Sequence, residues 1–520
     1  MRIRIRNAII PGIVFAASLC VSSLSAQETG YTDLYYNMNL SEDGWTSARY
    51  MQNAAAWNVG SPDGSVFEGD VNSASNNLFI ITSSPTTSDK QTLFGYKYSN
   101  WNIHDLTINM EMQTHYDMVE LVPSQHLTIG GNFDITINNQ AKWWAPGHRV
   151  KLDSGTSITV EGDMRVENSM TAAAAEAGSF GQSGIDFCLV TSGSDWNASF
   201  AVKGNLVFVS ADTRMQYFNS DCILFSTSAA SITVGGYVDM TQTRAGTRTW
   251  DLFDATAWDS RTSDIFVGGL EGGGALQITN AHNATVNLTF TNSSEYSYSG
   301  TFASRAASSN KLNVEMDAAA QSGKQTLIIQ EGGAVTGDAA LDPSRLESVT
   351  VRNGTFNFGT YSGLVNGTLN MAGENGRLEI SAAGGAGAGT VAFENAVFES
   401  GSIEFTIEEV AADKIEISGA LSKSGDGKIT IEFDADPYDI YEWILASGSD
   451  TIEYELITFG STDMSDSDFT AAANLGEGVF ATLLLRDNAL AVQFSTVPEP
   501  AEAAAVLGLL ALFAAARRRK

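Results

Sequence analysis

The chain has 520 residues, with 29 Lys and Arg against 60 Asp and Glu, and its formal net charge is −31. This balance excludes a nucleic-acid-binding protein held by a broad basic surface, because such proteins gain most of their affinity from neutralising phosphates. The chain is 43% hydrophobic and 17% charged, which is enough apolar material for two or three folded domains.

Residues 1–26 have the organisation of a secretory signal peptide. Three arginines lie within Met1–Asn7, an almost wholly apolar run follows from Ala8 to Val21, and small residues dominate Ser22–Ala26. This order predicts cleavage between Ala26 and Gln27 and export from the cytoplasm.

Residues 27–100 lack the glycine-centred pattern of the segment that follows them. We interpret them as an N-terminal cap that covers an open strand edge.

From residue 101 to 270 one short pattern recurs: two apolar residues separated by a small or polar one, any residue, then Gly. Its copies begin at Leu127, Ile158, Phe200, Ile232 and Ile265. Their last glycines are Gly131, Gly162, Gly204, Gly236 and Gly269, and the interval between Gly162 and Gly204 is the longest. A nearly constant period of this size indicates a repeat architecture.

Each repeat holds about three short strands. The pattern predicts a strand, a Gly where the backbone bends or takes positive φ, and a second strand. A further apolar run precedes the pattern, as at Phe187–Val190, and no proline occurs between Pro146 and Pro343. Three strands and no proline match one coil of a right-handed parallel β-helix, whose ladders need every N–H donor. The alternative is a series of tandem antiparallel β-sandwiches, since short strands at this spacing suit both folds.

Residues 271–495 continue in the same style. Clean alternation of apolar and polar residues predicts strands at Lys414–Leu421, Lys428–Phe433 and Tyr454–Ile457, and Tyr296–Phe302 is interpreted as a turn. In style, this region resembles the passenger regions of autotransporter-type β-helical surface proteins. We therefore expect an all-β body throughout.

Few residues suggest chemistry. No nucleophile elbow, phosphate-binding loop or metalloprotease helix motif is present, and the five histidines lack zinc-ligand spacing. We therefore expect no catalytic residue, metal site or cofactor, apart from opportunistic calcium binding by acidic clusters. Those clusters are Asp434, Asp436 and Asp439, and Asp463, Asp466 and Asp468; ordinary Asx turns are the alternative interpretation.

Two cysteines, Cys188 and Cys222, remain after the predicted cleavage. They precede Gly204 and Gly236 by similar distances, so equivalent glycines would place them on adjacent coils. A disulfide between them is possible in an oxidising compartment; buried free thiols are the alternative.

The C-terminal segment, residues 496–520, contains Val497-Pro498-Glu499-Pro500, an apolar run from Ala501 to Ala516, and Arg517-Arg518-Arg519-Lys520. Sixteen helical residues span roughly 24 Å, less than a hydrocarbon core of about 30 Å. The basic cluster would remain on the cytoplasmic side of the membrane. This order closely resembles the PEP-CTERM sorting signal of Gram-negative, exopolysaccharide-producing bacteria. The resemblance implies transient insertion in the inner membrane and processing near Pro498-Glu499-Pro500 by an exosortase-type membrane protease.

Together these features predict a non-enzymatic structural or adhesion protein of the cell surface or extracellular matrix, associated with exopolysaccharide or biofilm. A precursor held in the inner membrane would precede the delivered form, with exopolysaccharide as a possible partner and no nucleic acid. The alternative is a β-helical polysaccharide lyase or glycoside hydrolase. Such enzymes need clustered cations in a groove, and this body is poor in cations.

Overall fold

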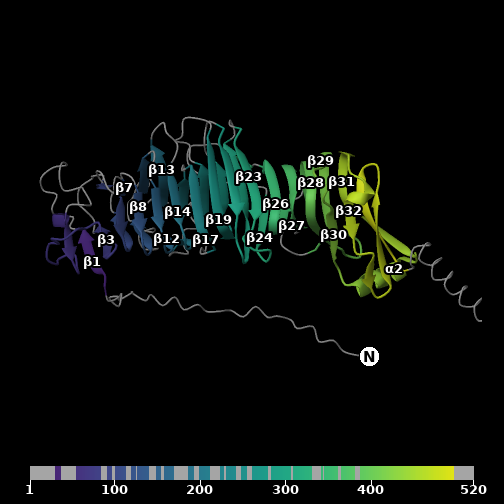
Figure 1. Ribbon diagram of the computed structural model, residues 1–520, viewed down its shortest axis with the longest axis horizontal. Helices are drawn as coiled ribbons and strands as arrows, with labels where there is room; N and C mark the ends of the chain where they lie inside the picture. Colours follow the sequence, from purple (N-terminus) through teal and green to yellow (C-terminus); the bar gives the residue numbers. More distant parts are fainter. Residues whose placement is uncertain are drawn as a thin grey trace, which may run out of the picture.

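The computed structural model is an elongated stack of strands with a single α-helix among the described residues, near one end (Figure 1). The structure describes residues 30–36, 54–82, 91–95, 100–112, 119–123, 126–139, 148–153, 157–168, 185–192, 198–210, 223–227, 230–241, 248–253, 261–278, 283–305, 309–330, 341–343, 345–360, 365–380 and 387–496.

Most strands belong to three ladders of parallel strands, and the chain passes from one ladder to the next as it advances. The first ladder begins with β1 (Thr32–Tyr36) and continues through β3 (Asn76–Thr82), β6 (Leu106–Met112), β9 (Phe133–Asn139), β12 (Met164–Asn168), β15 (Leu206–Ser210) and the later parts of β17 (Ser231–Met240) and β19 (Thr262–Gly272).

The second ladder runs almost the full length of the body. It contains β5 (Trp101–Ile103), β8 (His126–Ile129), β11 (Ser157–Val160), β14 (Ser199–Val202), the early parts of β17 and β19, β21 (Thr285–Phe290), β23 (Lys311–Asp317), the early parts of β26 (Ser348–Thr360), β27 (Val365–Ile380) and β28 (Thr390–Thr406), then β29 (Lys414–Lys423) and β31 (Thr451–Thr462).

The third ladder lies beside the other two. It contains β4 (Gln91–Gly95), β7 (Val119–Pro123), β10 (His148–Asp153), β13 (Ile185–Ser192), β16 (Ile223–Thr227), β18 (Arg248–Phe253), β20 (Ala275–Ile278), β22 (Glu295–Arg305), β24 (Lys324–Gln330), the later parts of β26, β27 and β28, β30 (Ile429–Asp434) and β32 (Phe469–Ala471).

This parallel pairing confirms the all-β prediction and rules out the tandem antiparallel sandwiches. The register advances from His126 to Ser157, Ser199, Ser231 and Asp264, which reproduces the intervals between the repeated glycines, the longer second interval included. The ladders start at β1 and β3, so they already occupy part of the predicted cap, residues 27–100. The segment Tyr296–Phe302 lies within β22 and is not a turn, which corrects that expectation.

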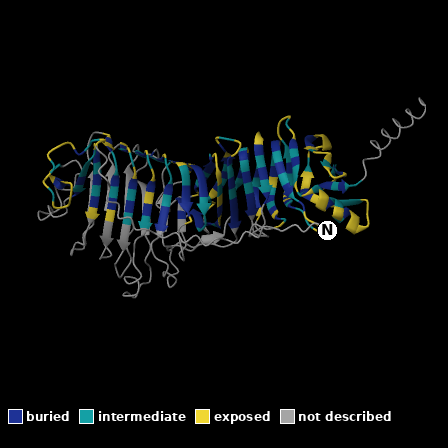
Figure 2. Cartoon of the chain, turned by 90° about the horizontal axis from the view of Figure 1, so that it is seen from below, coloured by how far each residue is buried: buried dark blue, intermediate teal, exposed yellow. Residues whose placement is uncertain are grey.

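The core is formed by inward-facing residues that stack on one another from coil to coil. In the second ladder each register position from Ile158 to Leu421 is apolar and buried, and the same alternation of buried and more exposed residues runs along the strands in Figure 2. The column is Ile158, Phe200, Ile232, Ile265, Leu288, Val314, Val349, Leu369, Ala396 and Leu421. Burying each large side chain contributes about 1.5–3 kcal/mol, so the column stabilises the stack continuously.

The coil becomes shorter toward the C-terminus. One coil of the first half runs from Ser199 to its register partner Ser231, whereas a later coil needs only the shorter stretch from Ser348 to Thr368. The first ladder ends at Gly272, which pairs with Tyr298 of β22, and the long strands β26, β27 and β28 each contribute to both remaining ladders. The prediction of three strands per repeat is therefore confirmed for the first half and does not hold for the second.

Side-chain amides complete the backbone hydrogen bonding where a ladder stops. The buried Gln325 side chain accepts from the Leu270 N–H and donates to the Leu270 carbonyl, each at 2.9 Å. At the other end, Asn72 donates to the Asn100 carbonyl at 2.9 Å and accepts from the Asn102 N–H at 2.6 Å. Each amide takes the place of an absent strand, and at the buried Leu270 this matters most, because unpaired backbone groups are costly when buried.

Antiparallel strands cover the ends and one side of the stack. At the N-terminal end β2 (Trp57–Val59), which follows the short η2 (Ala54–Ala56), pairs with β1. The short β25 (Leu341–Pro343) pairs with β22. At the C-terminal end β31 pairs with β35 (Ala489–Ser495), then β34 (Val479–Leu485) and β33 (Asn474–Gly476) follow, with η4 (Asp466–Asp468) nearby. Helix α2 (Pro437–Ser447) packs against β31, β34 and β35, so the open edge is covered.

The recurring glycines are required by close approach between coils. Gly162, Gly204 and Gly236 form a backbone ladder with N···O distances of 2.9–3.0 Å. None has positive φ, but the backbone bends at Gly162 and Gly204, so of the two predicted reasons for glycine the bend is confirmed there and the positive φ is wrong. A Cβ on Gly204 would lie 2.2 Å from Oδ1 of Asp163 and 2.7 Å from the Gly162 carbonyl oxygen.

Asp and Asn side chains at the position after the repeated glycine, and Asp105 at the equivalent position after His104, form a second ladder of hydrogen bonds, which we call the Asx ladder. Each Oδ1 accepts the backbone N–H of the equivalent residue on the next coil, at 2.7–3.1 Å. Its acceptors are Asp105, Asn132, Asp163 and Asn205. Glycine and Asx are therefore one unit: the oxygen occupies the space where a Cβ would lie.

We predict that Gly204→Ala lowers the free energy of unfolding by about 1–3 kcal/mol, because the added methyl overpacks the Asx ladder. Gly130→Ala is the matched control, since its Cβ would meet only an ordinary contact, 3.5 Å from the Ile103 carbonyl oxygen. Denaturant unfolding of both variants measures the difference. Equal stability of the two variants would contradict this role of Gly204.

Candidate functional site: a charge ladder on the third strand ladder

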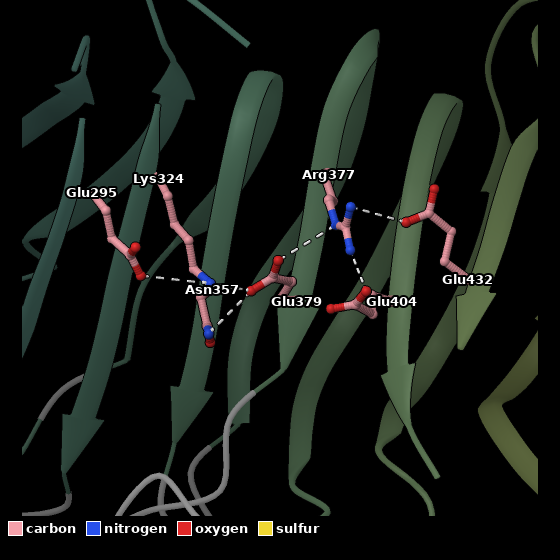
Figure 3. Close-up of polar contacts among 7 residues, drawn as sticks. All are labelled: Glu295, Lys324, Asn357, Arg377, Glu379, Glu404 and Glu432. Carbon is pink, nitrogen blue, oxygen red and sulfur yellow. Dashed lines mark hydrogen bonds and ion pairs between the residues drawn. The ribbon is translucent and has the colours of Figure 1, made fainter. Parts of the chain in front are cut away.

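The main cluster of interacting charges that the structure describes lies on the outer surface of the third strand ladder, across β22, β24, β26, β27, β28 and β30 (Figure 3). Between its two outward columns runs a column of inward residues, including Phe356, Leu378 and Ile403, which belongs to the core. We call the cluster the charge ladder; its members are Glu295, Lys324, Asn357, Arg377, Glu379, Glu404 and Glu432.

Three glutamates of the charge ladder occupy the same register position on successive coils. Glu379 pairs with Glu404, and Glu404 with Glu432, across adjacent parallel strands. Strands in a sheet are about 4.8 Å apart, so these carboxylates face one another directly. Like charges in this position destabilise a sheet unless a cation lies between them.

Arg377 supplies that cation. Its guanidinium forms a close ion pair with Glu404, lies 3.2 Å from Oε2 of Glu432 through Nη1, and 3.4 Å from Oε1 of Glu379 through Nε. A single planar side chain therefore joins three carboxylates from three coils, which suits the forked geometry of arginine.

Lys324 extends the network toward the N-terminus. Its Nζ lies 2.7 Å from Oε2 of Glu379 and 3.8 Å from Oε1 of Glu295. Asn357 donates from Nδ2 to the same Oε2 of Glu379 at 3.4 Å. Glu379 is thus the shared acceptor, and its side chain is only 15% exposed.

Burial raises the pKa of Glu404 above its ordinary value. The nearby charges of Glu379 and Asp434 act in the same direction, and Arg377 opposes them only in part. The neutral form of Glu404 is therefore favoured more in the folded chain than in the unfolded chain.

None of the residues predicted from sequence as sites is a member of the charge ladder. Ala26, Gln27, the motif Val497-Pro498-Glu499-Pro500 and the cluster Arg517-Arg518-Arg519-Lys520 lie outside the described residues, so those predictions stay predictions. Among the described helices, none is both long and apolar enough to cross a membrane.

The register of β13 and β16 bears on the predicted disulfide. In the backbone register, Cys188 on β13 is the partner of Ser226 on the next coil, and Ile223, the first residue of β16, is the partner of Ile185. Cys222 lies outside the described residues. The disulfide remains a prediction, and the neighbour that the structure gives Cys188 on the next coil is a serine.

Three of the acidic residues that suggested calcium have structural roles. Asp436 caps the N-terminus of α2 by accepting a backbone N–H two residues later at 3.0 Å. Asp463 accepts the Lys423 backbone N–H at 2.8 Å. Asp468 pairs with the Lys423 ammonium and accepts the Ser465 N–H at 2.7 Å, and these bonds lower its pKa to about 2. In the part of the chain that the structure describes, no group of three His, Cys, Asp or Glu residues is placed to hold a metal ion.

Sequence reasoning did not predict the charge ladder, although a signal for it is present. Glu379, Glu404 and Glu432 each lie between two apolar residues, in Leu-Glu-Ile, Ile-Glu-Phe and Ile-Glu-Phe. This repeated triplet marks an outward acid flanked by inward residues. Only the register shows that the three triplets are neighbours.

Comparisons of the chain with protein-family models, with curated proteins and with solved structures find no match.

Because its folded pKa is raised, Glu404 stabilises the fold below its unfolded pKa of about 4.3 and loses that contribution as the pH rises through the folded value. We therefore predict that Glu404→Gln raises the free energy of unfolding at pH 7, by no more than about 1 kcal/mol for this half-buried position. The gain should shrink as the pH falls toward about 4, where the wild-type acid is itself neutral. Thermal melts across this pH range measure the effect.

Glu315→Gln is the matched control, because Glu315 also pairs with an arginine, Arg352, at 2.8 Å on the same body. This control should gain no stability at pH 7. A lower melting temperature for Glu404→Gln than for wild type at pH 7 would show that the Arg377 ion pair outweighs burial.

Proposed function

We propose that the chain is a right-handed parallel β-helix that serves as a non-enzymatic structural or adhesion protein, exported to the cell surface or extracellular matrix. The observation that carries the proposal is the in-register stacking of coils into one elongated body (Figure 1). A right-handed coil is the expected hand, because connections between parallel strands of one sheet turn that way.

The surface contacts support a structural role. Several of the described charged side chains pair across neighbouring coils, as Lys311 does with Glu347 at 2.7 Å and Arg352 with Glu315 at 2.8 Å. A chain of polar side chains joins Asp264, Asn287 and Asn313 at 2.8–2.9 Å in the same manner. Such contacts stiffen a rod along its axis.

The acidic surface suits a protein that is exposed outside the cell. A net charge of −31 favours solubility and repels other acidic polymers, so association with acidic exopolysaccharide would require divalent cations as bridges. Exopolysaccharide is therefore the partner that we propose for the delivered protein.

The two terminal segments supply the proposed route. Residues 1–26 act as the signal peptide, and residues 496–520 act as a PEP-CTERM signal that an exosortase-type protease recognises at Pro498-Glu499-Pro500. Two prolines keep this segment free of helix, which suits a protease groove. The basic cluster from Arg517 to Lys520 holds the precursor in the inner membrane until processing.

A second candidate, a β-helical polysaccharide lyase or glycoside hydrolase, is favoured by one observation. Glu379 and Glu404 are register neighbours, and Glu404 has the raised pKa of a general acid. Arg377 contacts both carboxylates, however, so both are already engaged in ion pairs. We therefore rank this function second.

Deletion of residues 497–520 should abolish retention of the precursor in the inner membrane and delivery to the surface, in a Gram-negative host that has an exosortase. Cell fractionation and surface labelling measure the change, and the truncated protein should keep the melting temperature of the full chain. Glu499→Ala tests recognition alone, with Glu502→Ala as the matched control in the same tail.

Unchanged localisation of the truncated chain would refute the sorting proposal. Release of oligosaccharides from the host exopolysaccharide by the full chain, lost in Glu404→Gln, would establish the enzyme instead.

A further inference from the structure

Three side chains of the charge ladder carry groups that can react with one another, beyond the ion pairs that they form. Lys324 on β24, Asn357 on β26 and Glu379 on β27 lie on three adjacent parallel strands. Together they offer an amine, a carboxamide and a carboxylate (Figure 3). These are a nucleophile, an electrophilic carbon with a leaving amine, and a group that can carry protons between them.

The geometry brings the three groups together at one oxygen. Oε2 of Glu379 lies 2.7 Å from Nζ of Lys324 and 3.4 Å from Nδ2 of Asn357. The attacking nitrogen and the leaving nitrogen therefore contact the same carboxylate oxygen. Holding reacting groups in contact in this way removes much of the entropic barrier to a slow reaction.

The register allows the link without moving the backbone. Lys324 faces Thr355 on the neighbouring strand, and Asn357 is two residues beyond Thr355 on the same face. Such a diagonal pair has Cα atoms about 8 Å apart, a gap that a long lysine and a short asparagine side chain can bridge. In Figure 3 the dashed lines from the lysine amine and from the asparagine amide meet at the Glu379 carboxylate.

The site is partly protected from water. The side chains of Lys324 and Glu379 are 28% and 15% exposed, and the core residue Phe356 is buried between the two outward columns.

We propose that Lys324 and Asn357 join in an intramolecular isopeptide bond, with Glu379 as the proton carrier. Glu379 takes a proton from the Lys324 ammonium, and the neutral amine attacks Cγ of Asn357. The new Nζ–Cγ bond forms, the Cγ–Nδ2 bond breaks, and the protons lost by Nζ pass through the carboxylate to the departing nitrogen. The products are an amide link and one ammonium ion, and Glu379 is regenerated; no oxidant or other reactant takes part.

The link would tie two adjacent coils covalently at the place where the stack has narrowed from three ladders to two. It would close the loop between residues 324 and 357, and it would remove one positive charge from the charge ladder. Cross-links of this kind stabilise chiefly by restricting the unfolded chain.

Peptide mapping of the denatured full-length protein tests the proposal. Acylated Lys324 resists trypsin, so the expected product is a branched peptide of residues 312–345 joined to residues 353–377, lighter by one ammonia than the two peptides together. Glu379→Gln should leave Lys324 free and cleaved, and Glu295→Gln, which alters the other carboxylate near Lys324, should keep the branch.

Two results would overturn the proposal. Complete cleavage after Lys324 in the wild-type protein, with an unmodified 353–377 peptide, would exclude the bond whatever the variants do. A branch that persists in Glu379→Gln would exclude Glu379 as the proton carrier. Thermal melts accompany each variant, so that a loss of the branch through misfolding is recognised.

Discussion

Parallel strands stacked in register, about 4.8 Å apart, are the constraint on which the rest of this structure depends. Each residue has as its neighbours the residues at the same position on the coils before and after it. A large apolar residue at an inward position is therefore followed by another, as in the column that begins at Ile158 and Phe200. The same rule brings identical charges together on the outside, so the surface needs cations placed between them.

The Asx ladder and the charge ladder are two arrangements that accommodate equivalent polar residues on adjacent coils. In the Asx ladder an oxygen such as Oδ1 of Asp163 meets a backbone N–H of the next coil, and glycine at position 204 makes the room. In the charge ladder Arg377 contacts three glutamates that would otherwise repel one another. The acid surplus of the whole chain is therefore tolerated where cations and backbone donors are placed in register with the acids.

The repeat could be predicted from the sequence because its glycines keep a fixed position in each coil. Their spacings give the observed register, and the lack of proline reflects ladders that use every N–H donor. The close approach between coils that requires glycine was not predictable, because the clash of a Cβ at Gly204 involves Asp163, which lies a full coil earlier in the chain.

Other features could not be predicted from the sequence for similar reasons. The end of the first ladder depends on Gln325 meeting Leu270, a contact between residues that are 55 positions apart. Helix α2, by contrast, has local signals: Asp436 as N-cap, Pro437 in the first turn and Gly448 in the left-handed conformation at its end. These signals lie in a segment flanked by predicted strands. Its acidic residues were interpreted as Asx turns or an opportunistic calcium site, and the helix was not predicted.

The register of the second ladder is the central claim, and engineered cysteines test it most directly. In a chain whose native cysteines are replaced by serine, Ser199→Cys with Ser231→Cys should form a disulfide, because these residues are register partners about 4.8 Å apart. Ser199→Cys with Thr233→Cys, a diagonal pair about 8 Å apart, should keep two free thiols. Alkylation followed by mass measurement distinguishes the two states. A disulfide in the second pair and free thiols in the first would contradict the stacked, parallel arrangement described here.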